Sequence, residues 1–363
     1  MSDTPQNLLI RGVNWLGDAI MTLPAVTRLR EALPKTRFTL LSHEKLAGLW
    51  AHTAHFDQVL TFAKEESPFV ISKRLKPKDF DAVLILPNSF RTALEVWHAG
   101  IPRRIGYAGN WRSPLLTHAI VPRPEAIPMQ KRMPIDIEYR LINHLKPQTF
   151  PESAHHIHQY LHLAQHLGAS SKPLAPQLER TENAPVFSAT EKPRPYIGLI
   201  AGAEYGPAKR WPTEHFIETA SQLIEQRQAH VLLLGGPGDQ DTAAEIADAL
   251  PADHHTNLAG QTTLPELVSA LAACDAVLTN DTGPMHVAAA TGTPVIVPFG
   301  STSPDLTGPG LPDNPLSPHQ LLRTTADCSP CFLRKCPIDF RCLKEISPAD
   351  AVAAVERVLD QSA

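Results

Sequence analysis

Residues 275–299 read DAVLTNDTGPMHVAAATGTPVIVPF, and this stretch decides the fold class. An apolar run at 275–279 leads into a short polar turn with glycine, then a helical pattern of small residues, then a second apolar run at 294–299. Two short strands joined by a helix are typical of a parallel βαβ unit. The turn places the N–H groups of Thr282 and Gly283 at the start of a helix, where an anion such as phosphate binds. The stretch therefore predicts a parallel α/β sheet with a phosphate site at its edge.

The same alternation of strand and helix patterns occurs twice in the chain. Apolar runs at 7–13, 38–42, 57–62 and 81–86 form one series, and those at 196–201, 230–234, 275–279 and 294–299 form a second. Residues 170–195, rich in proline, serine and charge, separate them and are typical of a linker. We predict an α/β protein with two Rossmann-like domains, 1–175 and 176–345, and a helix in 346–363 that could pack across their junction. Their parallel sheets would face a central cleft, because ligands of such sheets bind beyond the carboxyl ends of the strands.

Composition limits the class of protein. The 363 residues are 43% hydrophobic and 19% charged, which is ordinary for a globular protein and excludes a disordered chain. The apolar runs are far shorter than the ~20 residues that a bilayer-spanning helix needs, and the first residues lack the pattern of a signal peptide. We expect a cytoplasmic protein without a transmembrane segment, whose five cysteines are reduced thiols or metal ligands.

Charge is divided unevenly between the two series. Residues 1–150 hold 20 Lys and Arg against 13 Asp and Glu, a balance of +7, and the rest hold 13 against 24, a balance of −11. A basic half beside an acidic half favours an anionic partner on the first domain, such as a phosphorylated glycolipid, and disfavours nucleic-acid binding by the whole chain. Solubilising surface charge is the alternative interpretation.

Polar residues that could carry chemistry follow the strands of both series. Gly17 and Asp18 come directly after the first strand, where Gly17 allows close approach of a ligand and Asp18 is either a base or an acidic residue that stabilises the helix N-terminus. Lys209 ends a loop of small residues after the strand at 196–201, which suits a lysine that neutralises a diphosphate. His286 stands about one helical turn after Asp281, so it points to the same anion or is a buried core histidine.

Cysteine and histidine clusters raise the question of a metal. Four thiols, Cys328, Cys331, Cys336 and Cys342, fall within fifteen residues, which allows a structural zinc, although the spacing is not that of a standard zinc ribbon and free thiols are the alternative. His158, His162 and His166 share one helix face, for which we favour a solvated or interdomain surface over metal ligation.

Four motifs in order along the chain resemble the ADP-heptose:lipopolysaccharide heptosyltransferases. They are NWLGDAIMTLP at 14–24, GAEYGPAKRWP at 202–212, NDTGPMHVAAATGTP at 280–294 and FGSTSPDLTGP at 299–309. PNSFRTALEVWHAGIPRRIGY at 87–107 is similar to the heptosyltransferase II branch. The resemblance implies a GT-B fold and inverting transfer of L-glycero-D-manno-heptose from ADP-heptose to the heptosylated inner core of lipopolysaccharide. It implies no cofactor for catalysis.

The resemblance also implies roles for single residues. Asp18 matches the family's catalytic carboxylate, and Lys209 matches its diphosphate-contacting lysine. This lysine therefore counts both as a catalytic and as a donor-binding residue. The other donor-binding residues that it implies are Gly17, Asp239 on the ribose, Thr262 near the adenine, and Asp281, Thr282, Gly283 and His286. Arg91, Arg103 and Arg104 are candidates for binding the anionic acceptor, with a solvated surface as the alternative for each.

Other functions remain open at this point. The chain could be a heptosyltransferase with a different acceptor, a nucleotide-sugar 2-epimerase of the same fold, or a non-catalytic protein that senses a nucleotide sugar. A sensor needs the diphosphate contacts but no base such as Asp18. With a lipid-anchored acceptor, we expect a cytoplasmic enzyme with a peripheral place at the inner membrane surface.

Overall fold

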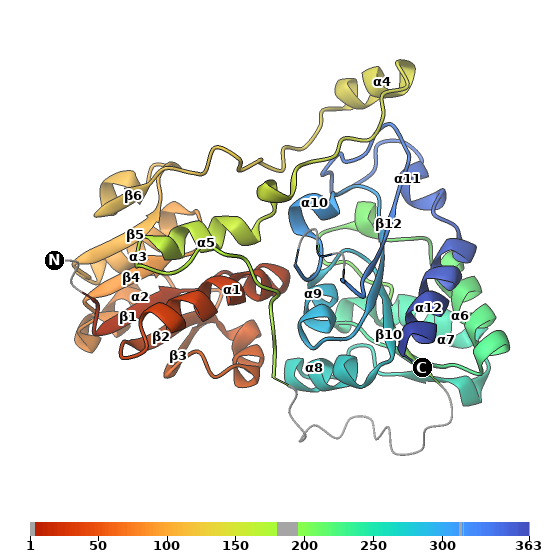
Figure 1. Ribbon diagram of the computed structural model, residues 1–363, viewed down its shortest axis with the longest axis horizontal. Helices are drawn as coiled ribbons and strands as arrows, with labels where there is room; N and C mark the ends of the chain where they lie inside the picture. The colour runs from red at the N-terminus through yellow and green to blue at the C-terminus, as the bar shows by residue number, and fades with distance from the viewer. Residues whose placement is uncertain (1–3, 180–194, 312–313, 315, 363) are drawn as a thin grey trace. The chain divides into compact units, whose positions relative to one another are not determined.

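The computed structural model describes residues 4–179, 195–311, 314 and 316–362. Contacts divide the chain into two units: 1–126 with 153–179, and 127–152 with 180–363. The chain thus passes from the first unit to the second at 126, returns at 153, and leaves again after 179 (Figure 1). The sequence placed 127–152 in the first domain, whereas the structure places them in the second. Most of the predicted linker, 180–194, lies outside the described residues.

The first unit is a parallel six-stranded sheet in the order β3-β2-β1-β4-β5-β6. Its strands β1 and β4 lie at the centre and read as continuous apolar runs, because both faces of the sheet are covered by helices. The strands are β1 (Asn7–Arg11), β2 (Arg37–His43), β3 (Gln58–Phe62), β4 (Ala82–Ile85), β5 (Arg103–Tyr107) and β6 (His118–Ile120). The helices are α1 (Leu16–Ala32), α2 (Pro68–Leu75), α3 (Phe90–His98) and α5 (Ile157–Gln165).

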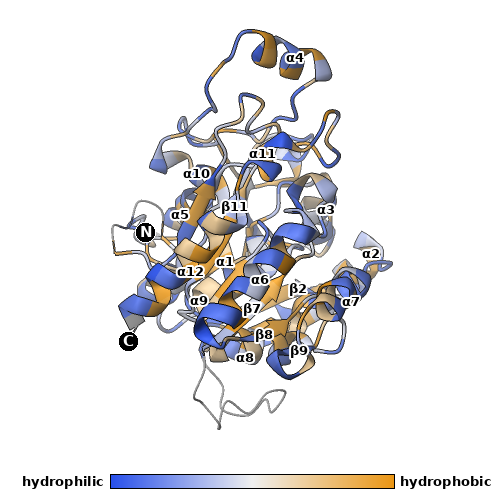
Figure 2. Ribbon diagram, turned by 90° about the vertical axis from the view of Figure 1, so that its right-hand side faces the viewer, coloured by the Kyte–Doolittle hydropathy of each residue, from blue (hydrophilic) through white to orange (hydrophobic). Residues whose placement is uncertain are grey.

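The second unit repeats this topology, with the strand order β12-β11-β10-β7-β8-β9. Figure 2 shows its strands β7 and β8 as hydrophobic and the helices α6 and α7 as amphipathic. The strands are β7 (Tyr196–Ile200), β8 (His230–Leu233), β9 (His255–Asn257), β10 (Ala276–Thr279), β11 (Val295–Phe299) and β12 (Gln320–Arg323). The helices are α4 (Pro134–Ile142), α6 (Thr213–Arg227), α7 (Gln240–Ala249), α8 (Leu264–Ala273), α9 (Gly283–Ala290), α10 (Pro304–Thr307), α11 (Arg341–Lys344) and α12 (Pro348–Ser362).

Both units therefore have the strand order of a Rossmann fold, which confirms the α/β class and the two Rossmann-like domains of a GT-B protein. The C-terminal helix α12 belongs to the second unit, where its apolar face joins the core and Arg227 of α6 pairs with Asp360 at 2.8 Å. Packing of this helix across the junction of the two units stays a prediction. Among the described residues, no helix is long and apolar enough to cross a membrane.

In each sheet the strand order reverses between two central strands, β1 and β4 in the first unit and β7 and β10 in the second. Ligands of doubly wound sheets bind at such a reversal, beyond the carboxyl ends of the strands. The loops that follow these four strands are therefore the places to look for a site.

Candidate active site

In the first unit, Asp18 stands in the first turn of α1, directly after β1, and is half-buried. The hydroxyl of Tyr160 on α5 donates a hydrogen bond to Oδ1 of Asp18 at 3.3 Å, since α5 packs along α1 (Figure 1). Burial, and after it the charge of Asp18, raises the pKa of Tyr160 well above its ordinary value. Tyr160 therefore remains a donor and fixes one oxygen of the carboxylate. No motif in the sequence indicated this tyrosine.

Arg91 is the acceptor candidate that lies at the same edge of the sheet as Asp18. It stands at the start of α3, which follows β4, and its side chain is 44% exposed. Its guanidinium donates to the backbone carbonyl of Glu66 and lies 3.3 Å from Oε1 of the buried Glu95. These contacts hold the arginine in place while leaving it open to solvent, as binding of an anionic ligand requires.

Arg103 and Arg104 are not brought to this edge. Both stand at the beginning of β5, and therefore at the amino-terminal edge of the parallel sheet. The Arg104 side chain donates to the carbonyls of Leu115 at 2.7 Å and Ile101 at 2.5 Å, and burial lowers its pKa. The two arginines at 103–104 thus serve to bond neighbouring loops. The position of Arg103 and Arg104 disagrees with the predicted binding of the acceptor. All strands of the sheet run in one direction, and ligands bind to the loops at their carboxyl ends, whereas these arginines stand at the amino-terminal edge.

Arg112 is a buried cation that the sequence interpretation missed. Its side chain is fully buried, it donates to the carbonyls of Tyr107 and Pro87, and it lies 3.3 Å from Oδ1 of Asn88. Burial lowers its pKa to about 10, so it is still charged at neutral pH. Arg112 ties the loop after β5 to the loop after β4, which leads into Arg91.

In the second unit, Lys209 and Asp281 form the centre of the site. Nζ of Lys209 lies 2.6 Å from Oδ2 of Asp281, and the hydroxyl of Thr302 donates to the same oxygen at 2.6 Å. Asp281 is 5% exposed. Burial by itself would raise the pKa of Asp281, but Lys209, Thr302 and the nearby His286 outweigh it and hold the pKa below its ordinary value. A lysine held by one buried carboxylate is positioned in advance for a phosphate.

Asn280 connects the two loops that carry this pair. Its side-chain amide donates to the carbonyl of Ala201 at 2.7 Å, and its Oδ1 accepts from the backbone N–H of Trp211 at 2.9 Å. The loop after β7 and the loop after β10 are thus fixed to one another across the reversal of strand order. Asn280 and Thr302 both stand in motifs quoted from the sequence, but neither residue was assigned a role from the sequence.

The remaining donor-binding candidates of the second unit surround this pair. Thr282 and Gly283 form the N-terminus of α9, and His286 is buried in its second turn beside Asp281. Asp239 reaches the loop after β7, because a Cβ added to Gly202 would lie only 2.0 Å from Oδ1 of Asp239. Thr262 lies in the loop that follows the edge strand β9, and Gly17 remains in the first unit beside Asp18.

The cysteines line one small cavity of the second unit, about 10 Å³ in volume. Within it the thiol of Cys342 hydrogen-bonds Cys328 and thereby lowers the pKa of Cys328 to about 7, while burial raises the pKa of Cys331. No three metal-ligand side chains in the described ranges are arranged so that they could hold a metal ion together, and this includes the histidines of α5. One of those, His162, instead contacts the Tyr107 hydroxyl at 3.0 Å.

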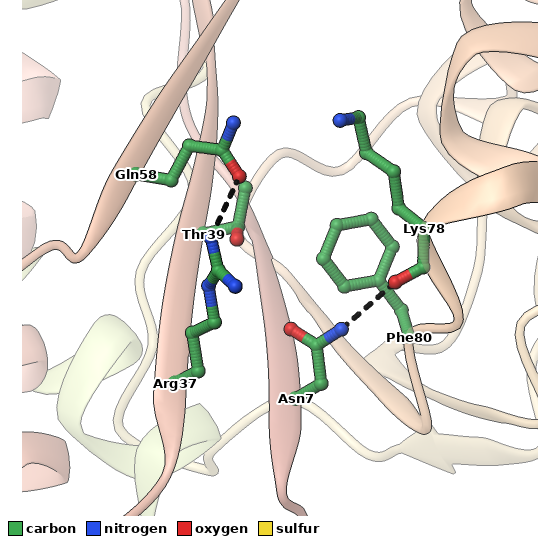
Figure 3. A pocket seen from close by; sticks show the side chains of 6 residues that line it. All are labelled: Asn7, Arg37, Thr39, Gln58, Lys78 and Phe80. Atoms are coloured by element: carbon green, nitrogen blue, oxygen red, sulfur yellow. Dashed lines mark hydrogen bonds between the residues drawn. The ribbon is translucent and has the colours of Figure 1, made fainter.

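A larger cavity of about 280 Å³ opens at the other edge of the first sheet. Its polar lining comes from the amino ends of β1, β2 and β3 and from the segment before β4, with Arg37 donating to Gln58 at 3.4 Å (Figure 3). Because it lies away from the carboxyl ends of the strands, where Asp18 stands, it is not part of the candidate site.

Comparison with known proteins agrees with this geometry. The family "Glycosyltransferase family 9 (heptosyltransferase)" matches residues 69–340. Lipopolysaccharide heptosyltransferase 2 of Escherichia coli K12 is 32% identical over 83% of this chain and 85% of its own. Lipooligosaccharide heptosyltransferase 2 of Haemophilus influenzae is 31% identical over 84% and 86%. The structure of E. coli ADP-heptose LPS heptosyltransferase II covers 98% of this chain and 99% of its own, with 29% identity and a TM-score of 0.77. The chain belongs to glycosyltransferase family 9, the heptosyltransferases.

Proposed function

We propose that this glycosyltransferase moves L-glycero-D-manno-heptose from ADP-heptose to the heptosylated inner core of lipopolysaccharide, with inversion at the anomeric carbon. The observation that carries the proposal is the arrangement at the two strand reversals: a carboxylate on the first unit, and a lysine with a helix N-terminus on the second. Relatives over 30% identical along most of the chain are named as heptosyltransferases of lipopolysaccharide or lipooligosaccharide.

In this mechanism Asp18 takes the proton from the acceptor hydroxyl as its oxygen bonds to the anomeric carbon. The bond between that carbon and the β-phosphate oxygen breaks, and ADP leaves with the bonding electrons. Lys209 and the N-terminus of α9 stabilise the charge that develops on the leaving diphosphate. Asp239 and Thr262 hold the ribose and adenine, and Arg91 binds an anionic group of the acceptor. The residues named can carry these steps without a metal.

Replacement of Asp18 by Asn tests the proposal, because Asn keeps the shape of the side chain and removes its basicity. We expect transfer to fall about 10²–10⁴-fold, as is typical for a lost acid or base, while the affinity for ADP stays unchanged. Transfer of heptose from ADP-heptose to single-heptose lipopolysaccharide is the assay. Near-normal turnover of Asp18→Asn would overturn the role of the base, and absence of transfer by the wild-type protein with both substrates would overturn the function.

We also propose that the enzyme works at the surface of an anionic membrane, bound through α2 and α3. These helices expose Phe69, Val70, Phe90 and Trp97, each 46–51% accessible. The rings of Phe69 and His98 meet at 5.1 Å, which joins the two helices into one face. Residues 68–78 beside it carry four Lys and Arg and no acidic residue. Exposed aromatic side chains flanked by basic ones suit the headgroup region of an anionic bilayer.

Cosedimentation with vesicles of phosphatidylglycerol and phosphatidylethanolamine tests this surface. The wild-type protein should bind, and the double variant Phe69→Ser, Trp97→Ser should lose most of the binding yet keep its turnover on a deacylated, water-soluble acceptor. The double variant Met133→Ser, Ile142→Ser, which removes exposed apolar side chains at the two ends of α4, is the matched control. Equal binding of wild type and the α2–α3 variant would overturn the surface without touching the transferase function.

A further inference from the structure

The segment that contains the four cysteines, residues 328–342, lies directly against the loop that carries Lys209. We call these the cysteine segment and the lysine loop, residues 202–210. The backbone N–H of Ala208 donates to the carbonyl of Arg334 at 3.0 Å, and the hydroxyl of Tyr205 donates to the carbonyl of Phe332 at 2.9 Å. The main chain of the cysteine segment therefore supports the lysine loop.

A glycine makes this close contact possible. Gly206 has a φ of +152°, and a Cβ added to it would lie 2.6 Å from the carbonyl oxygen of Arg334. A side chain at this position would push the two segments apart. The approach brings the side chain of Arg334, next to that carbonyl, to the lysine loop.

Two cations consequently lie close to the ring of Tyr205. Nζ of Lys209 lies 5.2 Å from the ring centroid, and Cζ of Arg334 lies 5.0 Å from it. The two positive groups are therefore no more than about 10 Å apart. They differ in one respect: Lys209 is paired with Asp281, whereas within the described ranges no carboxylate pairs with Arg334, which is exposed. The positive charge of Arg334 is available to a ligand.

We propose that Arg334 is a second cation of the donor site and binds the diphosphate of the nucleotide sugar, an inference that rests on the proposed function. The charge of Lys209 is shared with Asp281, so a single lysine leaves a diphosphate incompletely neutralised. Negative charge on the leaving ADP increases further as the glycosidic bond breaks. A guanidinium offers a fork of donors that matches two phosphate oxygens, which an ammonium group cannot do.

Calorimetry of ADP binding tests the proposal on the full-length protein with the variants Arg334→Ala, Arg334→Lys and Lys335→Ala. Arg334→Ala keeps the carbonyl that supports the lysine loop, so its fold should be intact. We expect ADP affinity to fall about 10–100-fold for Arg334→Ala, in the range of a lost hydrogen-bonded ion pair, and to recover in part for Arg334→Lys. Lys335 is the neighbouring exposed cation without a contact to Tyr205, and Lys335→Ala should bind ADP like the wild type.

The dependence of ADP affinity on salt separates direct binding from an indirect effect through Tyr205. A cation that touches the diphosphate makes the affinity fall with ionic strength, so this dependence should be weaker in Arg334→Ala. An unchanged salt dependence, or wild-type affinity in Arg334→Ala while Lys209→Ala binds poorly, would overturn the proposal and leave the donor site standing. Wild-type ADP affinity in both Arg334→Ala and Lys209→Ala would overturn the donor site itself.

Discussion

At the scale of single residues, the site depends on charged side chains that have hydrogen-bond partners before any ligand binds. Asp18 accepts a hydrogen bond from Tyr160, and Lys209 is held by Asp281. The first contact orients a base, and the second orients a cation. Because both side chains are already oriented, neither has to reorganise during the reaction.

Removal of the Tyr160 hydroxyl should show how far it positions the base. In Tyr160→Phe we expect kcat to fall about tenfold, which corresponds to one hydrogen bond, with the KM for the donor unchanged. The acidic limb of the kcat–pH profile should also move to higher pH, because an ionised carboxylate that loses a hydrogen bond takes up a proton more readily. Tyr139→Phe, an exposed tyrosine on α4, is the control. A lower kcat with an unmoved profile would contradict positioning through Asp18.

Replacement of Asp281 by Asn should destabilise the fold in a pH-dependent way. The variant leaves Lys209, whose side chain is 15% exposed, without its carboxylate, and about 3–5 kcal/mol of unfolding free energy should be lost at pH 7. The pKa of Asp281 in the folded protein lies below its ordinary value, so the paired carboxylate stabilises the fold above that ordinary value and ceases to do so as pH falls through the folded pKa. Urea unfolding should therefore show a difference between wild type and variant that shrinks below about pH 4. A difference that grows in acid would contradict the pairing.

At the scale of elements, short loops after the central strands carry most of the chemistry. β1 leads into α1 with Asp18, β7 into the lysine loop, and β10 into α9. The cysteine segment adds a further element, because it supports the lysine loop through Ala208 and Tyr205. The sequence indicated these cysteines only as possible ligands of a structural zinc or as free thiols, with no link to the donor site. The contacts instead make the lysine loop depend on this segment.

A structural zinc on the four thiols stays a prediction. In the structure Cys328 and Cys342 form a thiol pair, and no three possible metal ligands of the described residues are grouped for a metal, so zinc binding would require these side chains to rearrange. Elemental analysis of protein purified without chelators measures this directly. About one equivalent of zinc, lost on treatment with a strong chelator together with part of the ADP affinity, is the expected result. Less than about a tenth of an equivalent of any transition metal would leave four free thiols.

At the scale of the whole molecule, the two units share one topology but carry different functional candidates. All the donor-binding candidates except Gly17 belong to the second unit, and Asp18 and Arg91 belong to the first. The basic balance of residues 1–150 falls mainly on the unit that holds the acceptor candidate. One unit thus suits an anionic acceptor and the other a nucleotide.

Hydrogen–deuterium exchange with ADP should reveal this division. A ligand at 100 times its Kd stabilises the segments that it holds by up to about 2.7 kcal/mol against opening. Exchange should slow in the lysine loop and in residues 279–290, and should stay unchanged in β2 and β3. The variant Lys209→Ala at the same ADP concentration is the control and should lose the protection. Protection centred on β2 and β3 would contradict donor binding by the second unit.

The sequence by itself determined the parallel α/β class, the two repeats and most of the central strands. Buried parallel strands are continuous apolar runs, and the loops after them carry glycine and polar residues, so periodicity is enough to find them. The strands β6, β9 and β12 were not predicted because they are short edge strands with polar residues, and β5 was not predicted because it opens with two arginines. Asp18, Lys209 and Asp281 were found for the same local reason: each follows an apolar run.

Only the tertiary structure decided which of those residues meet. Tyr160 reaches Asp18 across 142 positions of sequence, and Thr302 and Lys209 converge on one oxygen of Asp281 from separate loops. It also assigned 127–152 to the second unit, and set Arg104 apart from Arg91 by the direction of a strand. Local patterns describe how a segment folds, whereas contacts between distant segments depend on the packing of whole elements, which no short stretch of sequence encodes.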